Sequence, residues 1–188
     1  MIKHLTNKLK SLALLDAIVE PEWQYRYFSY DSTWSNSEEM GSLRDGSGGQ
    51  WFLWTSGSLA GYKCVSPEDG LMDNLEEVKL QFPQTYKPFI TEPAFTMDHA
   101  TAIWYLDNSE WVKHGKKVDY LIDLNSVSSW GPKDYVSWAN EYYEREINLV
   151  AVQNIFAQEF SEKDAKLLNK EIDLISLEKE IIEIGFNS

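Results

Sequence analysis

The spacing of apolar residues changes along the chain from helical, to strand-like, and back to helical. Near the start, Leu5, Leu9 and Leu12 fit one face of a helix, so we predict a helix over residues 3–19 that ends before a proline. The aromatic-rich residues 23–34 fit neither period. We expect them to dock on the core as a loop or a short strand.

Residues 39–65 carry the most regular pattern, with three runs of strand-forming residues separated by two short Gly/Ser turns. The runs cover residues 39–44, 50–55 and 59–65. Consecutive strands joined by such short turns must be antiparallel neighbours. We therefore predict a meander of three antiparallel strands.

Later segments extend this sheet. Short helices are expected within residues 71–80 and 84–90, and strands at 101–106 and 110–113. A further amphipathic strand is predicted over residues 117–124, where apolar residues alternate with polar ones.

The last third of the chain returns to helical spacing. A long helix is predicted over residues 132–160, with proline in its first turn. Ser161 and Asp164 match a capping pattern that opens another helix. The final helix is expected to stop at Gly185.

Together these patterns predict an α+β fold, in which an antiparallel sheet of five to six strands packs against an N-terminal helix and C-terminal helices. We expect one domain over residues 1–188: the N-terminal helix within 1–22, mainly β structure in 23–125, and helices in 131–186.

The compartment is indicated by what the sequence lacks. No apolar run reaches the ~20 residues that a membrane-spanning helix needs. Asp16 interrupts the apolar stretch after the first lysines, so we expect no signal peptide. The single Cys64 cannot form an intramolecular disulfide, and this fits a cytoplasmic location.

The charge of the chain bears on its partners. Thirty acidic residues against 17 Lys and Arg give a net charge of −13. Such a field repels nucleic-acid phosphates and anionic lipids, so we expect neither nucleic acid nor membrane as a partner. It attracts a basic protein, although solubility alone also accounts for an acid surplus.

No motif in the sequence identifies a chemical reaction. The glycine-rich turn at 45–49 leads into a strand and not a helix, so it is expected to be a hairpin turn and not a phosphate-binding loop. Cys64 follows Lys63 at a strand end without a neighbouring histidine, so we expect a core residue. We expect no metal and no cofactor.

One stretch resembles a known family. It comprises Asp45-Gly-Ser-Gly-Gly-Gln-Trp-Phe-Leu-Trp54, then Gly57, then Gly61-Tyr62, and ends at Pro67-Glu68. It is similar to the central hairpin of SUKH-type domains, which are α+β. Many bacterial members are thought to be immunity proteins that bind and neutralise toxins, often nucleases, and others are regulators that act through protein contacts. In its general sequence character the chain is also similar to bacterial proteins of this size.

The expected function is therefore that of a non-enzymatic cytoplasmic protein-binding domain, and the resemblance implies an immunity-type inhibitor of a basic toxin. Acidic residues near the meander are the candidates for partner binding: Glu38, Glu39, Asp45, Glu68 and Asp69.

Two alternatives stay open. The chain could be a small hydrolase or metal-dependent enzyme that uses His99, His114 and a nearby carboxylate, although nothing in their spacing fixes a geometry. It could also be a small-ligand or sugar-binding module with an aromatic stacking platform. The candidates for that platform are Trp51, Trp54 and Trp34.

Overall fold

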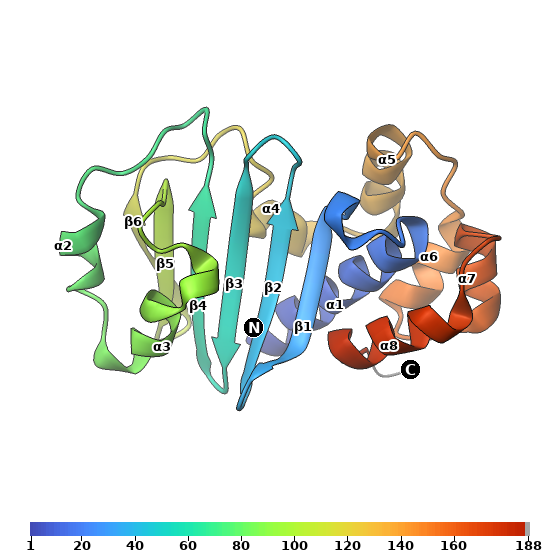
Figure 1. Ribbon diagram of the computed structural model, residues 1–188, viewed down its shortest axis with the longest axis horizontal. Coiled ribbons are helices and arrows are strands. Elements are labelled where there is room, and N and C mark those ends of the chain that lie inside the picture. Colours follow the sequence, from blue (N-terminus) through green and yellow to red (C-terminus); the bar gives the residue numbers. More distant parts are fainter. Residues whose placement is uncertain (187–188) are drawn as a thin grey trace.

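A six-stranded antiparallel sheet runs through the centre of the protein in the computed structural model, which describes residues 1–186 (Figure 1). Its strands are β1 (Phe28–Ser35), β2 (Glu38–Arg44), β3 (Gln50–Ser56), β4 (Leu59–Val65), β5 (Ala102–Asp107) and β6 (Glu110–Gly115). They lie in chain order, and each pairs with the next. The predicted α+β class and the meander over residues 39–65 are confirmed.

Helices cover both faces and one edge of the sheet. The α-helices are α1 (Ile2–Val19), α2 (Leu75–Lys79), α3 (Lys87–Thr91), α4 (Leu124–Ser129), α5 (Pro132–Tyr142), α6 (Leu149–Phe156), α7 (Glu162–Leu168) and α8 (Leu174–Ile184). Three short 3-10 turns are η1 (Trp23–Tyr25), η2 (Gln84–Tyr86) and η3 (Pro93–Phe95). The α5–α8 helices gather on the β1 side of the sheet (Figure 1).

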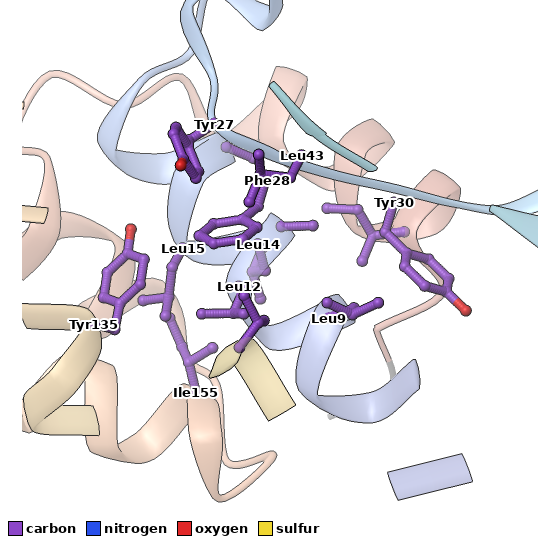
Figure 2. Packing of buried hydrophobic residues seen from close by; sticks show 14 of the residues in the cluster. Leu9, Leu12, Leu14, Leu15, Tyr27, Phe28, Tyr30, Leu43, Tyr135 and Ile155 are labelled. Carbon is purple, nitrogen blue, oxygen red and sulfur yellow. The ribbon is translucent and has the colours of Figure 1, made fainter. Parts of the chain in front are cut away.

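Two apolar cores follow from the alternation of side chains in the strands. Trp51 and Leu53 of β3 belong to the core formed with α1, whereas Trp54 belongs to the core formed with α2 and α3. Figure 2 shows the first core, where leucines of α1 pack against Phe28 of β1 and Ile155 of α6. Each fully buried side chain of this kind contributes about 1.5–3 kcal/mol.

Several predicted helix boundaries are confirmed. Helix α1 spans the predicted segment, and within residues 1–186 no helix is long and apolar enough to cross a bilayer. Ser161 and Asp164 form the capping box of α7. Gly185 ends α8 in the left-handed conformation, with φ of 66°.

The strand predicted over residues 117–124 is wrong, because residues 116–123 form a loop between β6 and α4, which begins at Leu124. The carboxylate of Asp69 accepts the backbone N–H groups of Asp119 (3.0 Å) and Tyr120 (3.3 Å), which therefore do not pair with a strand. The alternation does not bury one face either: Tyr120 is 74% exposed, and the buried residues are Leu121 and Leu124.

The helix predicted over residues 132–160 is also wrong, because it divides into α5 and α6. Glu144 has a left-handed backbone, with φ of 51°, and this breaks the helical path. The side chain of Asn140 accepts the N–H of Ile147 (2.8 Å), and Asn148 caps the start of α6. Two asparagines thus provide the turn. The aromatic stretch forms η1 and then β1, a longer strand than expected.

Candidate functional site

The five acidic residues predicted to bind a partner do not form one surface. Glu38 and Glu39 begin β2 and Asp45 follows its end, so they lie roughly 20 Å apart along the strand. Glu68 and Asp69 follow β4, and their loop lies beside the turn that Asp45 opens.

Three of these acids have structural roles inside the chain. Glu39 accepts the Tyr30 hydroxyl (2.7 Å) and pairs with Lys10 (2.8 Å). Asp45 accepts two backbone N–H groups of its own turn. Asp69 holds the loop after β6, as described above. Among residues 1–186, the other two acids make no side-chain hydrogen bond or ion pair.

The histidines proposed for the enzyme alternative lie in different environments. His99 is exposed and its Nδ1 lies 2.9 Å from Asp98. His114 lies on β6, with its ring 5.7 Å from that of Phe82 and 6.0 Å from that of Tyr105. In the described part of the chain, no three His, Cys, Asp or Glu side chains are grouped as metal ligands.

Other sequence candidates are core residues. Burial raises the pKa of the Cys64 thiol to about 12, so the thiol is protonated at neutral pH, as a core residue should be. Trp51 and Trp54 are buried and cannot stack on a sugar. Trp34 stacks on Phe95, with ring centroids 5.9 Å apart.

A cleft of about 640 Å³ opens where the end of α1, η1, the turn after β2 and the end of α5 meet. We call it the arginine cleft. Its lining residues are Glu20, Gln24, Tyr25, Arg26, Arg44, Gly46, Gly48, Gly49, Gln50, Tyr142, Tyr143 and Glu144. The chain has three arginines. Arg26 and Arg44 line the cleft. The third, Arg145, lies 3.7 Å from the carboxylate of Glu20, which also lines the cleft.

Arg26 and Arg145 each contact an acidic side chain and at least one backbone carbonyl within the protein. Arg26 is 5% exposed and forms a bidentate pair with Glu180 of α8 (2.6 and 3.1 Å). It also donates to the carbonyls of Glu20 and Pro21. Arg145 donates to the carbonyl of the last residue of α1. These two arginines therefore fix the end of α1 beside α8 and the turn after α5.

Arg44 differs from the other two. Its guanidinium carbon lies 3.7 Å from the ring centroid of Trp23, and its hydrogen bond goes to the Trp23 carbonyl (3.4 Å). No carboxylate pairs with it among residues 1–186. Burial, and then repulsion from Arg26, lower the pKa of Arg44, yet a guanidinium stays charged in proteins. Arg44 thus offers a cation with unused N–H donors.

Large aromatic side chains surround this guanidinium. Trp23 is 56% exposed and Tyr25 is 59% exposed, although both are large and apolar in part. Tyr142 stacks on Trp138 at 5.1 Å and lines the cleft. Exposed aromatic side chains gathered in one place are typical of an interaction site.

A buried carboxyl group holds the backbone next to the cleft. Asp16 of α1 accepts the backbone N–H groups of Tyr27 (3.1 Å) and Phe28 (2.7 Å) and the hydroxyl of Tyr135 (2.8 Å). Burial raises its pKa to about 7, and these hydrogen bonds partly offset that effect. The cleft residue Tyr143 accepts from the same Tyr27 N–H (3.2 Å). The start of β1, and with it η1, is thereby fixed on α1 and α5.

The arginine cleft was not predicted from the sequence. Two signals pointed to it: the aromatic stretch that fits no period, and the small number of arginines among the 17 basic residues. Asp16 also left a signal, since it is an acid inside the apolar run from Leu12 to Val19.

A scan against protein-family models, a search of the curated proteins and a search of the solved structures found no match to the chain.

Proposed function

We propose that this chain is a non-enzymatic, cytoplasmic protein-binding domain that docks its partner over the arginine cleft. One observation carries the proposal: Trp23 and Tyr25 expose more than half of their surface beside the unpaired Arg44. Trp, Tyr and Arg are the residue types most enriched among those that dominate binding energy at protein interfaces.

The shape of the site favours a protein over a small molecule. A small-ligand pocket buries most of its ligand between its walls. Here Tyr25 of the cleft lining, and Trp23 beside the lining residue Arg44, are each more than half exposed, an arrangement that suits the surface of another protein. The resemblance of residues 45–68 to SUKH-type domains supports the same class of function and adds the role of an immunity-type inhibitor of a toxin.

The acid surplus favours a partner with a basic surface, because a net charge of −13 attracts it before contact. Of the five acids predicted from the sequence, Glu38 and Glu68 are the ones without an internal role, and they are the best candidates for such attraction.

We expect that replacing both Trp23 and Tyr25 by Ala weakens partner binding at least tenfold, because truncation of a central aromatic residue costs about 2 kcal/mol or more. The partner is captured from a lysate of the source organism by the tagged chain and identified by mass spectrometry. Its affinity for each variant is then measured by calorimetry. Tyr120→Ala is the matched control, since Tyr120 is exposed on a loop outside the cleft. An unchanged affinity of the double variant would rule out the arginine cleft as the docking site.

The association rate with that partner is expected to fall as salt rises. Steering acts between separated charges, and the Debye length is only about 8 Å at 0.15 M salt. Glu38→Lys with Glu68→Lys should mimic high salt at unchanged thermal stability, whereas reversal of Glu39 or Asp69 should also destabilise the fold. Stopped-flow mixing measures the rate. An association rate independent of salt would show that the acid surplus serves solubility alone.

A further inference from the structure

We propose that Arg44 is the receptor for a carboxylate group of the partner protein, contributed by an Asp or Glu side chain. This inference rests on the proposed function and names the chemical group that the arginine cleft recognises.

Arg44 has no carboxylate partner among residues 1–186, although the protein is strongly acidic. Arg26 and Arg145 each have an acidic partner, Glu180 and Glu20. Even the adjacent Asp45 does not pair with Arg44 among the described residues, because its Oδ1 accepts the backbone N–H groups of Ser47 (2.7 Å) and Gly49 (2.9 Å). The cation is thus left free for an external anion.

The geometry of the guanidinium also favours a carboxylate. The five N–H donors of a guanidinium lie in its plane, and a carboxylate is bound best along two parallel N–H bonds at its edge. Trp23 covers a face of the Arg44 guanidinium at 3.7 Å, and stacking of this kind leaves the edge available. Since Arg44 lines the cleft, an incoming carboxylate reaches it from the cleft.

The charges that line the cleft favour a carboxylate over a phosphate. The lining cation Arg26 is neutralised by Glu180, and the lining acid Glu20 by Arg145. What remains is one guanidinium, with Glu144 also lining the cleft. One guanidinium can pair with one monoanionic carboxylate, whereas a phosphate dianion is repelled more strongly by Glu144 and needs more positive charge than this cleft offers.

The test uses the small number of arginines, since the Nε–H region of a ¹⁵N NMR spectrum contains only three side-chain signals. Arg44→Lys assigns one of them. The probes are the acetyl-Ala-Glu-Ala-amide peptide, its Gln counterpart and inorganic phosphate. We expect the Glu peptide to shift the Arg44 signal saturably, with a dissociation constant of about 1 mM, which corresponds to a weak single contact. The Gln peptide and phosphate should bind at least fivefold more weakly.

Arg44→Lys keeps the positive charge but loses the two parallel N–H donors of the guanidinium. It should therefore weaken binding of the Glu peptide severalfold at unchanged thermal stability. Equal shifts with the Glu and Gln peptides, equal shifts of all three arginine signals, or tighter binding of phosphate would each overturn the carboxylate assignment. The proposed function would survive those results if Trp23→Ala with Tyr25→Ala still abolished partner binding. The proposed function would itself fail if the variant with both Trp23→Ala and Tyr25→Ala bound the partner with normal affinity.

Discussion

Replacement of Asp16 by Asn is expected to flatten the pH dependence of stability between about pH 4 and pH 7. The carboxyl group of Asp16 is fully buried in the first core, and burial raises its pKa to about 7. In the unfolded chain an aspartate titrates near pH 3.9. Between these two values the folded protein holds one proton more than the unfolded chain does.

The sign of the effect follows from this difference. Protonation stabilises the folded state, so the contribution of Asp16 is fully present below about pH 4 and is lost as the pH rises through about 7. A shift of about 3 pH units corresponds to about 4 kcal/mol of unfolding free energy. Since other groups titrate in the same range, the informative quantity is the difference between the native chain and the variant.

Urea unfolding at half-unit pH intervals measures that difference. The side-chain amide introduced by Asp16→Asn has an oxygen that can keep accepting the N–H groups of Tyr27 and Phe28, so the variant should fold. Asp73→Asn is the matched control, because Asp73 is exposed and should leave the pH profile unchanged. Parallel profiles for the native chain and the Asp16→Asn variant would mean that Asp16 is ionised across this range.

Gly115→Ala is expected to destabilise the protein by about 3 kcal/mol or more. Gly115 ends β6 with φ of 106°, which costs any residue with a Cβ. An added Cβ would also lie 2.3 Å from Cε of Met72 and 2.6 Å from the carbonyl oxygen of Thr101. The methionine end can move, but the strand backbone cannot without disturbing the pairing of β5 with β6.

Gly57→Ala separates the two contributions. Gly57 also has a positive φ, of 59°, but an added Cβ there meets no atom within 4 Å. This control therefore reports backbone strain alone, about 1–2 kcal/mol. Chemical denaturation of both variants gives the comparison. Equal losses of stability would show that the clash at Gly115 is relieved by small movements.

The meander β2–β4 was predictable because its strands are joined by short turns with clear glycine and serine signals. The failures arose where a side chain far along the chain, or a single polar group, overrode the local pattern. The alternation after β6 fits a strand, yet Asp69 holds that backbone as a loop. The helical spacing after Pro132 continues without a break, yet Asn140 and Asn148 turn the chain there.

The arginine cleft is harder to predict because its parts are distant in sequence. Arg26 meets Glu180 across 154 positions, and Arg44 depends on Trp23 for its environment. The acids suggested by sequence were chosen for exposure near turns, but turn acids such as Asp45 and Asp69 often bind their own backbone. Surplus charge therefore did not lead to the arginine cleft, whereas Arg44, which has no carboxylate partner among residues 1–186, did.

The contact of α8 with α1 and β1 has a consequence for synthesis on the ribosome. The last helix of the described chain completes the packing of its first helix and first strand. Translation proceeds at about 5–20 residues per second, so Glu180 is synthesised on the order of 8–30 s after Arg26. During that interval the edge of β1 and the part of α1 that contacts α8 are uncovered in the nascent chain. Chaperone binding should therefore be strongest on chains stalled before residue 174 and should fall once α8 has emerged.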